Sequence, residues 1–126
     1  MKTRGARSER GLTARRSGRR GEILCALWLM AKGYRVLGFR LRTPHGEIDI
    51  LARRRDVLAV VEVKRRQNIE TALEAVTPLQ RDRLRRAAGA LAAARGEAAI
   101  SVRVDLMALA PGRLPRHIVD AWRDGD

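Results

Sequence analysis

Two neighbouring segments, 46–51 and 60–64, constrain the fold of this chain more than any other feature. Alternate positions in each segment carry isoleucine or valine, for example Ile48 and Ile50 in the first. Side chains two positions apart along a β-strand lie on the same face of a sheet, so the alternation predicts two strands. Only a short gap around Asp56 separates the strands, which makes them natural partners in a hairpin.

The polar residues of these two strands form a second pattern. Asp49 is expected on the same face as Glu47, whereas Glu62 and Lys64 share a face of the second strand. Pairing of the strands would bring Asp49 and Glu62 together, and carboxylate oxygens are the ligands that Mg²⁺ prefers. Lys64 could orient or help deprotonate an attacking water and stabilise developing negative charge. The pattern therefore predicts a metal-dependent site for phosphodiester hydrolysis.

Structural explanations compete with this hypothesis. Asp49 could cap the turn or pair with an arginine. Glu62 and Lys64 could form a surface salt bridge that contributes little to stability. An Asp…Glu-x-Lys pattern is also frequent by chance, so its placement on two adjoining strands with apolar alternates is what favours the metal site.

A helix is predicted over residues 18–32, with Gly33 in a typical C-cap position. Glu22 lies one turn before Cys25, on the apolar side of this helix. Because burial of an unpaired carboxylate costs free energy, Glu22 needs a partner there. We expect it to reach the metal directly or through a water, and interaction with the helix dipole in the first turn is the alternative.

A second helix is predicted to begin at Thr77, an N-cap residue, and Pro78, which suits the first helical position. Leu84 and Leu91 follow at helical spacing and mark its apolar side. Gln80 lies one turn before Leu84 on the same side. We expect Gln80 to position a water or a phosphate at the catalytic site.

The remaining alternating segments complete the order helix, three strands, helix, strand. The predicted strands cover residues 34–42, 47–53, 57–66 and 100–109. This order favours a mixed α/β sandwich in which helices pack on a central sheet. A chain of 126 residues is expected to form one domain with a sizeable core.

The charge of the chain favours a polyanionic partner. The sequence holds 27 Lys and Arg against 14 Asp and Glu, a formal net charge of +13, and 24 of the basic residues are arginines. Arginine can bind phosphate through two parallel hydrogen bonds, which favours nucleic acid, although a generally arginine-rich proteome is the alternative explanation. The arginines expected to contact nucleic acid are Arg40, Arg42, Arg65, Arg66, Arg81 and Arg85.

Residues 1–17 are expected to form a disordered basic arm, since they hold almost nothing to bury. The arm could contact nucleic acid nonspecifically or be a solvated tail. The apolar run at 23–31 is too short to span a bilayer, and no small-residue cleavage site follows it. Cys25 is the only cysteine, which excludes an intramolecular disulfide. We therefore expect a cytoplasmic protein.

Other conspicuous residues give weaker signals. His45, His117 and Asp120 have no companions at metal-ligand spacing. Asp105 is expected to form a structural pair with Arg103, two positions earlier on the same face of a strand. The sequence has no glycine-rich phosphate loop, no Ser-His-Asp set and no zinc-binding spacing.

Six short motifs together resemble a known family. They are GE at 21–22, KGYRVL at 32–37, GEIDI at 46–50, VEVK at 61–64, AVTP at 75–78 and RVD at 103–105. In this order they resemble the bacterial YraN family, an uncharacterised family similar to Holliday-junction resolvases and other PD-(D/E)XK nucleases. The resemblance implies that residues 18–123 form a single PD-(D/E)XK nuclease-like domain. Its fold would be the restriction-endonuclease-like three-layer sandwich of the α/β class, with a mixed central sheet flanked by helices.

The resemblance also implies roles for individual residues. Glu22, Asp49, Glu62 and Lys64 fall on the helix glutamate, the metal aspartate and the E-x-K pair of the nuclease core. Asp49, Glu62 and Glu22 would be the metal ligands, with Mg²⁺ as the cofactor and Mn²⁺ as a substitute. Two positions depart from the family pattern: Arg40 stands where an asparagine is usual, and the segment around Gln80 lacks the usual lysine.

The hypothesis from the sequence is a metal-dependent endonuclease of the Holliday-junction-resolvase-like type that hydrolyses DNA, including branched DNA. A homodimer is expected by analogy with resolvases that cut two strands symmetrically. A noncatalytic nucleic-acid-binding module on the same fold and a scaffold for protein partners are the alternatives, because a fold alone does not fix a function.

Overall fold

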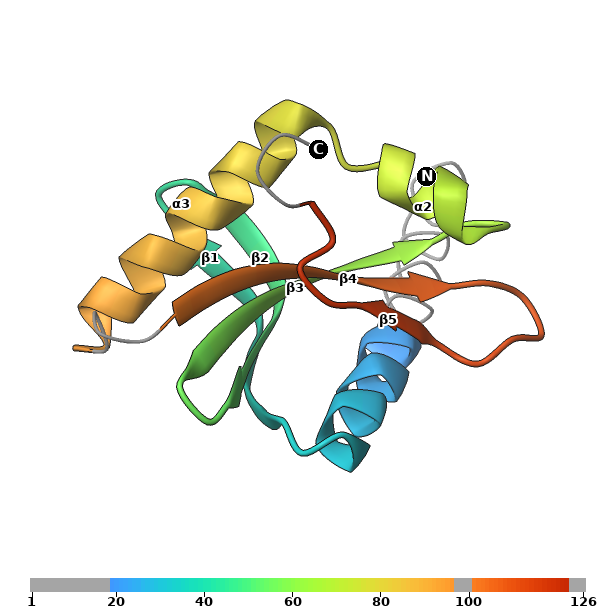
Figure 1. Ribbon diagram of the computed structural model, residues 1–126, viewed down its shortest axis with the longest axis horizontal. Helices are drawn as coiled ribbons and strands as arrows, with labels where there is room; N and C mark the ends of the chain where they lie inside the picture. The colour runs from blue at the N-terminus through green and yellow to red at the C-terminus, as the bar shows by residue number, and fades with distance from the viewer. Residues whose placement is uncertain (1–18, 97–100, 123–126) are drawn as a thin grey trace, which may run out of the picture.

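The computed structural model describes residues 19–96 and 101–122 (Figure 1). Residues 19–31 are helical and are called the N-terminal helix below. The elements that follow are β1 (Arg35–Thr43), β2 (Gly46–Arg54), β3 (Val57–Arg65), α2 (Ile69–Glu74), α3 (Pro78–Ala94), β4 (Ser101–Leu109) and β5 (Arg116–Ile118). The predicted basic arm, 1–17, lies outside the described residues. Within the described ranges, no helix is long and apolar enough to cross a membrane.

The strands form one mixed sheet of five strands in the order β1-β2-β3-β4-β5. Neighbouring strands are antiparallel, except that β3 and β4 are parallel. A parallel pair needs a crossover connection, and the chain between β3 and β4 supplies it with α2 and α3. The β1–β2 and β2–β3 connections are tight turns at 44–45 and 55–56. The prediction of a mixed α/β sheet with flanking helices is confirmed.

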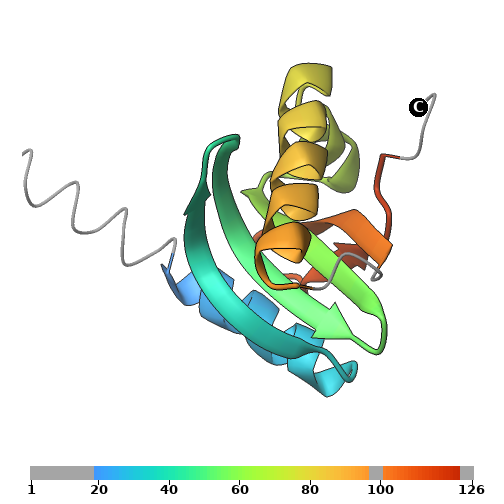
Figure 2. The same cartoon turned by 90° about the vertical axis from the view of Figure 1, so that its left-hand side faces the viewer.

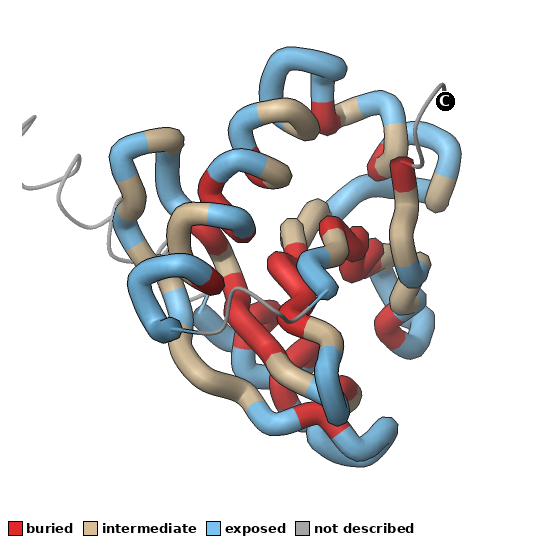
Figure 3. Tube along the Cα trace, turned by 60° about the vertical axis from the view of Figure 1, so that its left-hand side comes forward, coloured by how far each residue is buried: buried red, intermediate tan, exposed pale blue. Residues whose placement is uncertain are grey.

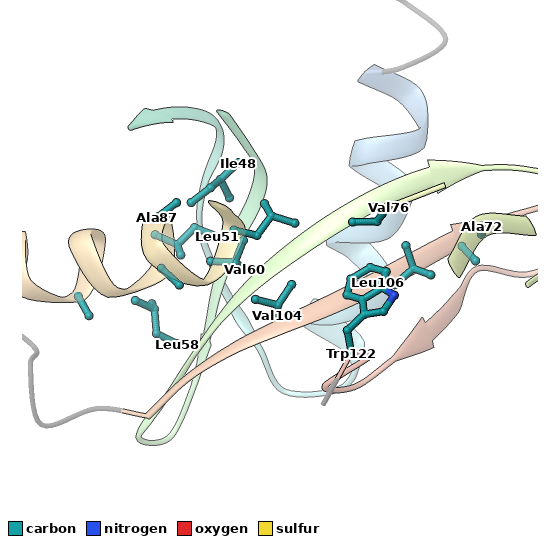
Figure 4. Packing of buried hydrophobic residues seen from close by; sticks show 14 residues of the cluster. Ile48, Leu51, Leu58, Val60, Ala72, Val76, Ala87, Val104, Leu106 and Trp122 are labelled. Atoms are coloured by element: carbon teal, nitrogen blue, oxygen red, sulfur yellow. The ribbon is translucent and has the colours of Figure 1, made fainter. Parts of the chain in front are cut away.

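Helices cover both faces of the sheet, which gives three layers (Figure 2). The N-terminal helix contributes Cys25 and Leu29 to a core cluster that also contains Ile50 and Val61. On the other face, α2 and α3 cover a second cluster, in which Ile48, Leu51 and Val60 lie beside Ala87 (Figure 4). Buried positions follow the strands and the inward sides of the helices (Figure 3).

The ends of the two predicted helices agree with their capping residues. Gly33 has a φ of +92°, and the Tyr34 N–H donates to the Leu29 carbonyl at 3.0 Å, which closes the N-terminal helix. At the start of α3, the side chains of Thr77 and Gln80 form a reciprocal capping box. Both predicted boundaries are therefore confirmed.

Helix α2 is not among the elements that the sequence predicts. Its N-cap is Asn68, whose Oδ1 accepts a hydrogen bond from the Thr71 N–H at 2.8 Å. The helix has six residues, and Ala72 is its one fully covered side chain. A segment this short shows less than two turns of periodicity, so it leaves little signal in the sequence.

Strict alternation of side chains breaks within β2. Ile48 packs in the cluster under α3, whereas Ile50 packs in the cluster under the N-terminal helix. The ladder between β2 and β3 ends at the pair Ile50–Val61, while β2 continues alongside β1 (Figure 2). The expectation that Ile48 and Ile50 share one face is wrong, because the β1–β2 hairpin coils away from β3 at this point.

Candidate metal and nucleic-acid site

The candidate site lies where β2 and β3 separate. The last paired residues of the two strands are Ile50 and Val61. Two residues further along β3, the Val63 N–H donates a hydrogen bond of 2.8 Å to Asp49 Oδ2. A side chain thus replaces the backbone partner that a continued ladder would supply. This bond fixes the Asp49 carboxylate against β3, next to Glu62.

Glu62 and Lys64 project from the same face of β3, as the alternation predicts. Their side chains form an ion pair, with 3.5 Å between Lys64 Nζ and Glu62 Oε1. Only 16% of the Glu62 side chain and 23% of the Lys64 side chain are exposed. The pair is therefore largely desolvated, unlike an ordinary surface salt bridge.

Burial disfavours the ionisation of both carboxylates. Burial raises the pKa of Asp49, and the negative charge of Glu22 adds to that rise, while the Val63 N–H and Lys64 oppose it. Burial also raises the pKa of Glu62 to about 7, with a further increase from the charge of Asp49 and an opposing effect of Lys64. Two carboxyl groups held together with incomplete compensation favour the presence of a cation between them.

The donor set suits a hard cation with a partly aqueous shell. Mg²⁺ is commonly bound through one or two carboxylates and keeps several waters, and Asp49 and Glu62 provide such a pair. Among the described residues, no group of three or more His, Cys, Asp or Glu side chains is arranged to hold a metal ion. A closed tetrahedral zinc site is therefore not a match for these residues. The Cys25 thiol is fully buried, and burial raises its pKa to about 12.

Glu22 lies on the buried side of the N-terminal helix, as predicted, but its carboxylate has a basic partner. Arg40 Nε donates to both Glu22 oxygens, at 2.9 and 3.0 Å. Glu22 is close enough to raise the pKa of Asp49. The structure thus brings Glu22 to the edge of the site and pairs it with Arg40, so its predicted role as a metal ligand stays a prediction.

Arg40 adopts a conformation that is uncommon for its residue type. Its φ is +49°, in the left-handed region that glycine and asparagine tolerate best. This backbone turn lies within β1, at the point where the arginine meets Glu22 from the neighbouring helix. The contact holds a locally strained strand in place, which is the pattern seen at many functional sites.

Gln80 lies beside the site, but its side chain stabilises the start of α3. Its Oε1 accepts a hydrogen bond from the Thr77 N–H at 2.9 Å. Gln80 also lines a small cavity of about 170 Å³ together with Glu62 and Arg83. The structure therefore places Gln80 near Glu62, together with Arg83, which is not among the site residues predicted from the sequence.

The predicted nucleic-acid-binding arginines separate into three that contact other parts of the protein and three that are exposed, and Arg40, bound to Glu22, belongs to the first group. Arg81 Nε donates to the Val76 carbonyl at 3.1 Å and its guanidinium lies 5.5 Å from the centre of the Trp122 ring. Arg85 donates to the Trp122 carbonyl. These two arginines hold the C-terminal segment on α3. The exposed members of the set are Arg42, Arg65 and Arg66.

The predicted Arg103–Asp105 pair is confirmed. Arg103 donates to both Asp105 oxygens, at 2.7 and 2.8 Å. His117 Nε2 lies 2.7 Å from Asp105 Oδ2, a contact that joins β5 to β4 and has no signal in the sequence. Although burial opposes it, the hydrogen bonds from His117 and Arg103 lower the pKa of Asp105. This buried network is structural and separate from the carboxylate pair.

The fold and the site together define an α/β protein that carries an Asp…Glu-x-Lys cluster where two strands of a mixed sheet separate. The chain belongs to the uncharacterised protein family UPF0102, whose sequence profile matches residues 21–109. This is the YraN family, so the resemblance of the six motifs is confirmed.

Relatives from several bacteria support this assignment. A UPF0102 protein of Caulobacter vibrioides is 66% identical over 119 residues, covering 94% of this chain and 95% of the relative. One from Caulobacter sp. strain K31 is 68% identical over 114 residues, covering 90% and 82%. One from Paramagnetospirillum magneticum is 50% identical over 115 residues, covering 87% and 89%. Sequence similarity thus extends over most of this chain and most of each relative.

Proposed function

We propose that this protein is a metal-dependent endonuclease that hydrolyses DNA phosphodiester bonds on a PD-(D/E)XK, restriction-endonuclease-like fold. One observation carries the proposal: Asp49 and Glu62 lie together in a largely desolvated place, with Lys64 Nζ 3.5 Å from Glu62. A partly buried acidic pair with a lysine beside it suits a cation and a phosphate better than it suits stability.

The proposed roles follow from the positions of the side chains. Asp49 and Glu62 would hold Mg²⁺, or Mn²⁺ in its place. When bound, the ion would neutralise charge on the scissile phosphate and make a water more acidic. Lys64 would hold the attacking water or a phosphate oxygen by a charge-assisted hydrogen bond. Glu22 would fix Arg40 at the edge of the site, where the remaining guanidinium N–H groups can contact a phosphate.

DNA is the proposed substrate because the chain carries a formal net charge of +13 and the site region adds exposed arginines. Arg42, Arg65 and Arg66 are exposed and lie at the ends of β1 and β3. Arginine on a surface of this charge supports phosphate binding with a steep dependence on salt. Branched recombination intermediates belong to the proposal only through the resemblance to resolvases.

The proposed homodimer has a surface that suits it. The outer side of the N-terminal helix exposes four large apolar side chains, Ile23, Leu24, Leu27 and Met30. A helix that is apolar all round favours burial of its second face. The net positive charge of the chain opposes self-association, and a contact through this apolar helix face places few like charges together. Sedimentation velocity should show a dimer for the natural chain and a monomer for Leu27→Glu.

A cleavage assay tests the proposed activity. Purified protein would be incubated with branched, flapped, single-stranded and linear DNA in Mg²⁺, in Mn²⁺ and in EDTA. We expect metal-dependent cleavage of at least one substrate, abolished by Asp49→Asn and by Glu62→Gln. Asp56→Asn, an exposed carboxylate in the β2–β3 turn, is the matched control and should retain activity. Cleavage that persists at the natural rate in Asp49→Asn would contradict the proposal.

Binding measurements on the same proteins separate the alternatives. Salt-dependent DNA binding without turnover, unchanged by Glu62→Gln, favours a noncatalytic nucleic-acid-binding module. Affinity for a protein and none for DNA favours a scaffold for protein partners.

A further inference from the structure

A second cavity, of about 520 Å³, lies at the carboxyl ends of β3 and β4. Its walls come from the segment between β3 and α2, the end of β4, and the chain that leads into β5. The volume is within the range of ordinary small-ligand sites. Ligands of α/β proteins commonly bind beyond the carboxyl ends of parallel strands, and β3 and β4 are the parallel pair of this sheet.

The cavity adjoins the candidate catalytic lysine. In the β3–β4 ladder Lys64 pairs with Ala108, and Ala108 lines the cavity. Paired residues of neighbouring strands project to the same side of a sheet, so Ala108 lies next to Lys64 on the face that carries Glu62. Arg66, two residues after Lys64, is also in the wall. A strand of nucleic acid that contacts Lys64 would therefore lie beside a residue that lines this cavity.

The lining of the cavity is basic. It holds three arginines, Arg66, Arg113 and Arg116, against one carboxylate, Glu70. Arg66 Nη1 donates to the Arg65 carbonyl at 2.7 Å. Arg113 and Arg116 are exposed and, within the described part of the chain, donate no side-chain hydrogen bond and form no ion pair. Two unengaged guanidinium groups at one cavity suit an anion such as phosphate.

The same cavity also offers apolar and amide surfaces. Ile69 and Leu114 line it, and 75% of Leu114 is exposed. Asn68 is the N-cap of α2, and its Oδ1 accepts hydrogen bonds from the Thr71 N–H at 2.8 Å and from the Thr71 hydroxyl at 2.7 Å. Its NH₂ group can therefore donate to a ligand. A nucleotide combines a phosphate with a flat base that stacks on apolar side chains and arginine planes. A concave pocket admits such a base only when it is unpaired, because pairing keeps the base inside the duplex.

We propose that this cavity binds an unpaired nucleotide that flanks the scissile phosphodiester. Its phosphate contacts Arg113 and Arg116, and its base lies against Ile69 and Leu114. The inference rests on the proposed function and narrows its substrate class to DNA with a single-stranded segment beside the cut. A fully paired duplex lacks the group that the cavity accepts.

Binding measurements on the full chain test this inference without any cleavage. Fluorescence anisotropy in EDTA would compare a labelled single-stranded oligonucleotide with a blunt duplex of the same length. The variants are Arg113→Gln/Arg116→Gln and, as the matched control, Arg35→Gln/Arg55→Gln, which removes two exposed arginines at the opposite end of the sheet. Thermal melts would show that both variants fold.

We expect the Arg113/Arg116 variant to lose about tenfold or more in affinity for the single strand relative to the control variant. Both variants should bind the duplex equally. The slope of log Kobs against log salt on the single strand should fall in magnitude by about 0.7, because the two arginines together neutralise one phosphate. Leu114→Ser should weaken single-strand binding and leave this slope unchanged, because it removes a base contact only.

Two results would overturn the inference. One is single-strand affinity equal to that of the control variant. The other is an equal loss on single strand and duplex, which would show a general electrostatic effect. If selective loss occurs but no DNA is ever cleaved, the nucleotide pocket stands and the proposed hydrolysis fails. If Asp49-dependent cleavage is present but the arginine variant keeps its single-strand affinity, the hydrolase stands and the pocket fails.

Discussion

Asp49 Oδ2 accepts a hydrogen bond of 2.8 Å from the Val63 N–H, two residues beyond the last β2–β3 pair. This hydrogen bond satisfies a backbone donor just past the end of the β2–β3 ladder, and it holds the Asp49 carboxylate beside Glu62. Fold and candidate chemistry therefore depend on one side chain. Substitutions that separate hydrogen bonding from charge can distinguish the two roles.

Asp49→Asn and Asp49→Ala should differ in stability although both abolish metal-dependent activity. An asparagine oxygen can still accept from the Val63 N–H, whereas alanine leaves that donor without its partner. We expect the free energy of unfolding of Asp49→Ala to lie about 1–2 kcal/mol below that of Asp49→Asn. Urea unfolding in EDTA measures this difference. Equal stability of the two variants would show that the bond does not support the strand.

Glu62 should make the metal-free protein less stable as the pH rises. Its pKa in the folded state is raised to about 7 from an ordinary value of 4.5, so the folded state retains a proton that the unfolded chain has lost. The contribution of protonated Glu62 to the free energy of unfolding is fully present below pH 4.5, its ordinary pKa. It is lost progressively as the pH rises toward and through 7. Glu62→Gln should therefore gain stability over the natural chain, on the order of 2 kcal/mol at pH 8 and little at pH 4.5. Thermal melts across this range in EDTA would measure the gain, and a difference independent of pH would contradict the explanation.

Arg40 should be replaceable by residues that tolerate its backbone conformation. Asparagine and glycine adopt a φ of +49° more readily than alanine does, so Arg40→Asn and Arg40→Gly should be more stable than Arg40→Ala. Each of the three variants leaves Glu22 without its cation, and we expect a loss of about 1–3 kcal/mol in Arg40→Ala. A double variant with Glu22→Gln should recover part of that loss. Chemical denaturation of the single and double variants provides the cycle, and strict additivity would rule out the pair as a source of stability.

Bound metal should stabilise the natural chain through the same two carboxylates. A ligand that binds only the folded state adds about 1.4 kcal/mol at ten times its dissociation constant. Mg²⁺ or Mn²⁺ should therefore raise the melting temperature of the natural chain and of Asp56→Asn, and leave that of Glu62→Gln unchanged. Equal shifts in all three proteins would indicate nonspecific ion binding.

The sequence predicts the four longer strands and the two longer helices well, because their signals are local. Alternation over 60–64 is sufficient to place Glu62 and Lys64 on one face of β3, and capping residues locate the ends of both longer helices. Alternation does not place Asp49, because it breaks between Ile48 and Ile50. The face of Ile48 was mispredicted, since the coiling of β2 away from β3 is a property of the assembled sheet. Helix α2 is too short to show a period.

Contacts between residues far apart in the chain account for the remaining differences between the sequence-based predictions and the structure. Arg40 meets Glu22 across 18 positions of the chain, and Arg85 meets Trp122 across 37. Neither pairing has a sequence signature, so charge counting assigned Arg40 and Arg85 to nucleic acid alone. The cavity beyond Lys64 also could not be predicted from the sequence. Arg113 and Arg116 line it together with Arg66 only because β4 pairs with β3.

The most direct test of the central claim is anomalous diffraction from crystals of this protein grown with Mn²⁺. We expect a peak between Asp49 and Glu62, with carboxylate oxygens at about 2.1 Å, as in magnesium sites. The peak should be absent in Glu62→Gln crystals grown in the same way. A fully occupied Mn²⁺ site elsewhere in the chain, with Asp49 and Glu62 not coordinated to it, would contradict the account.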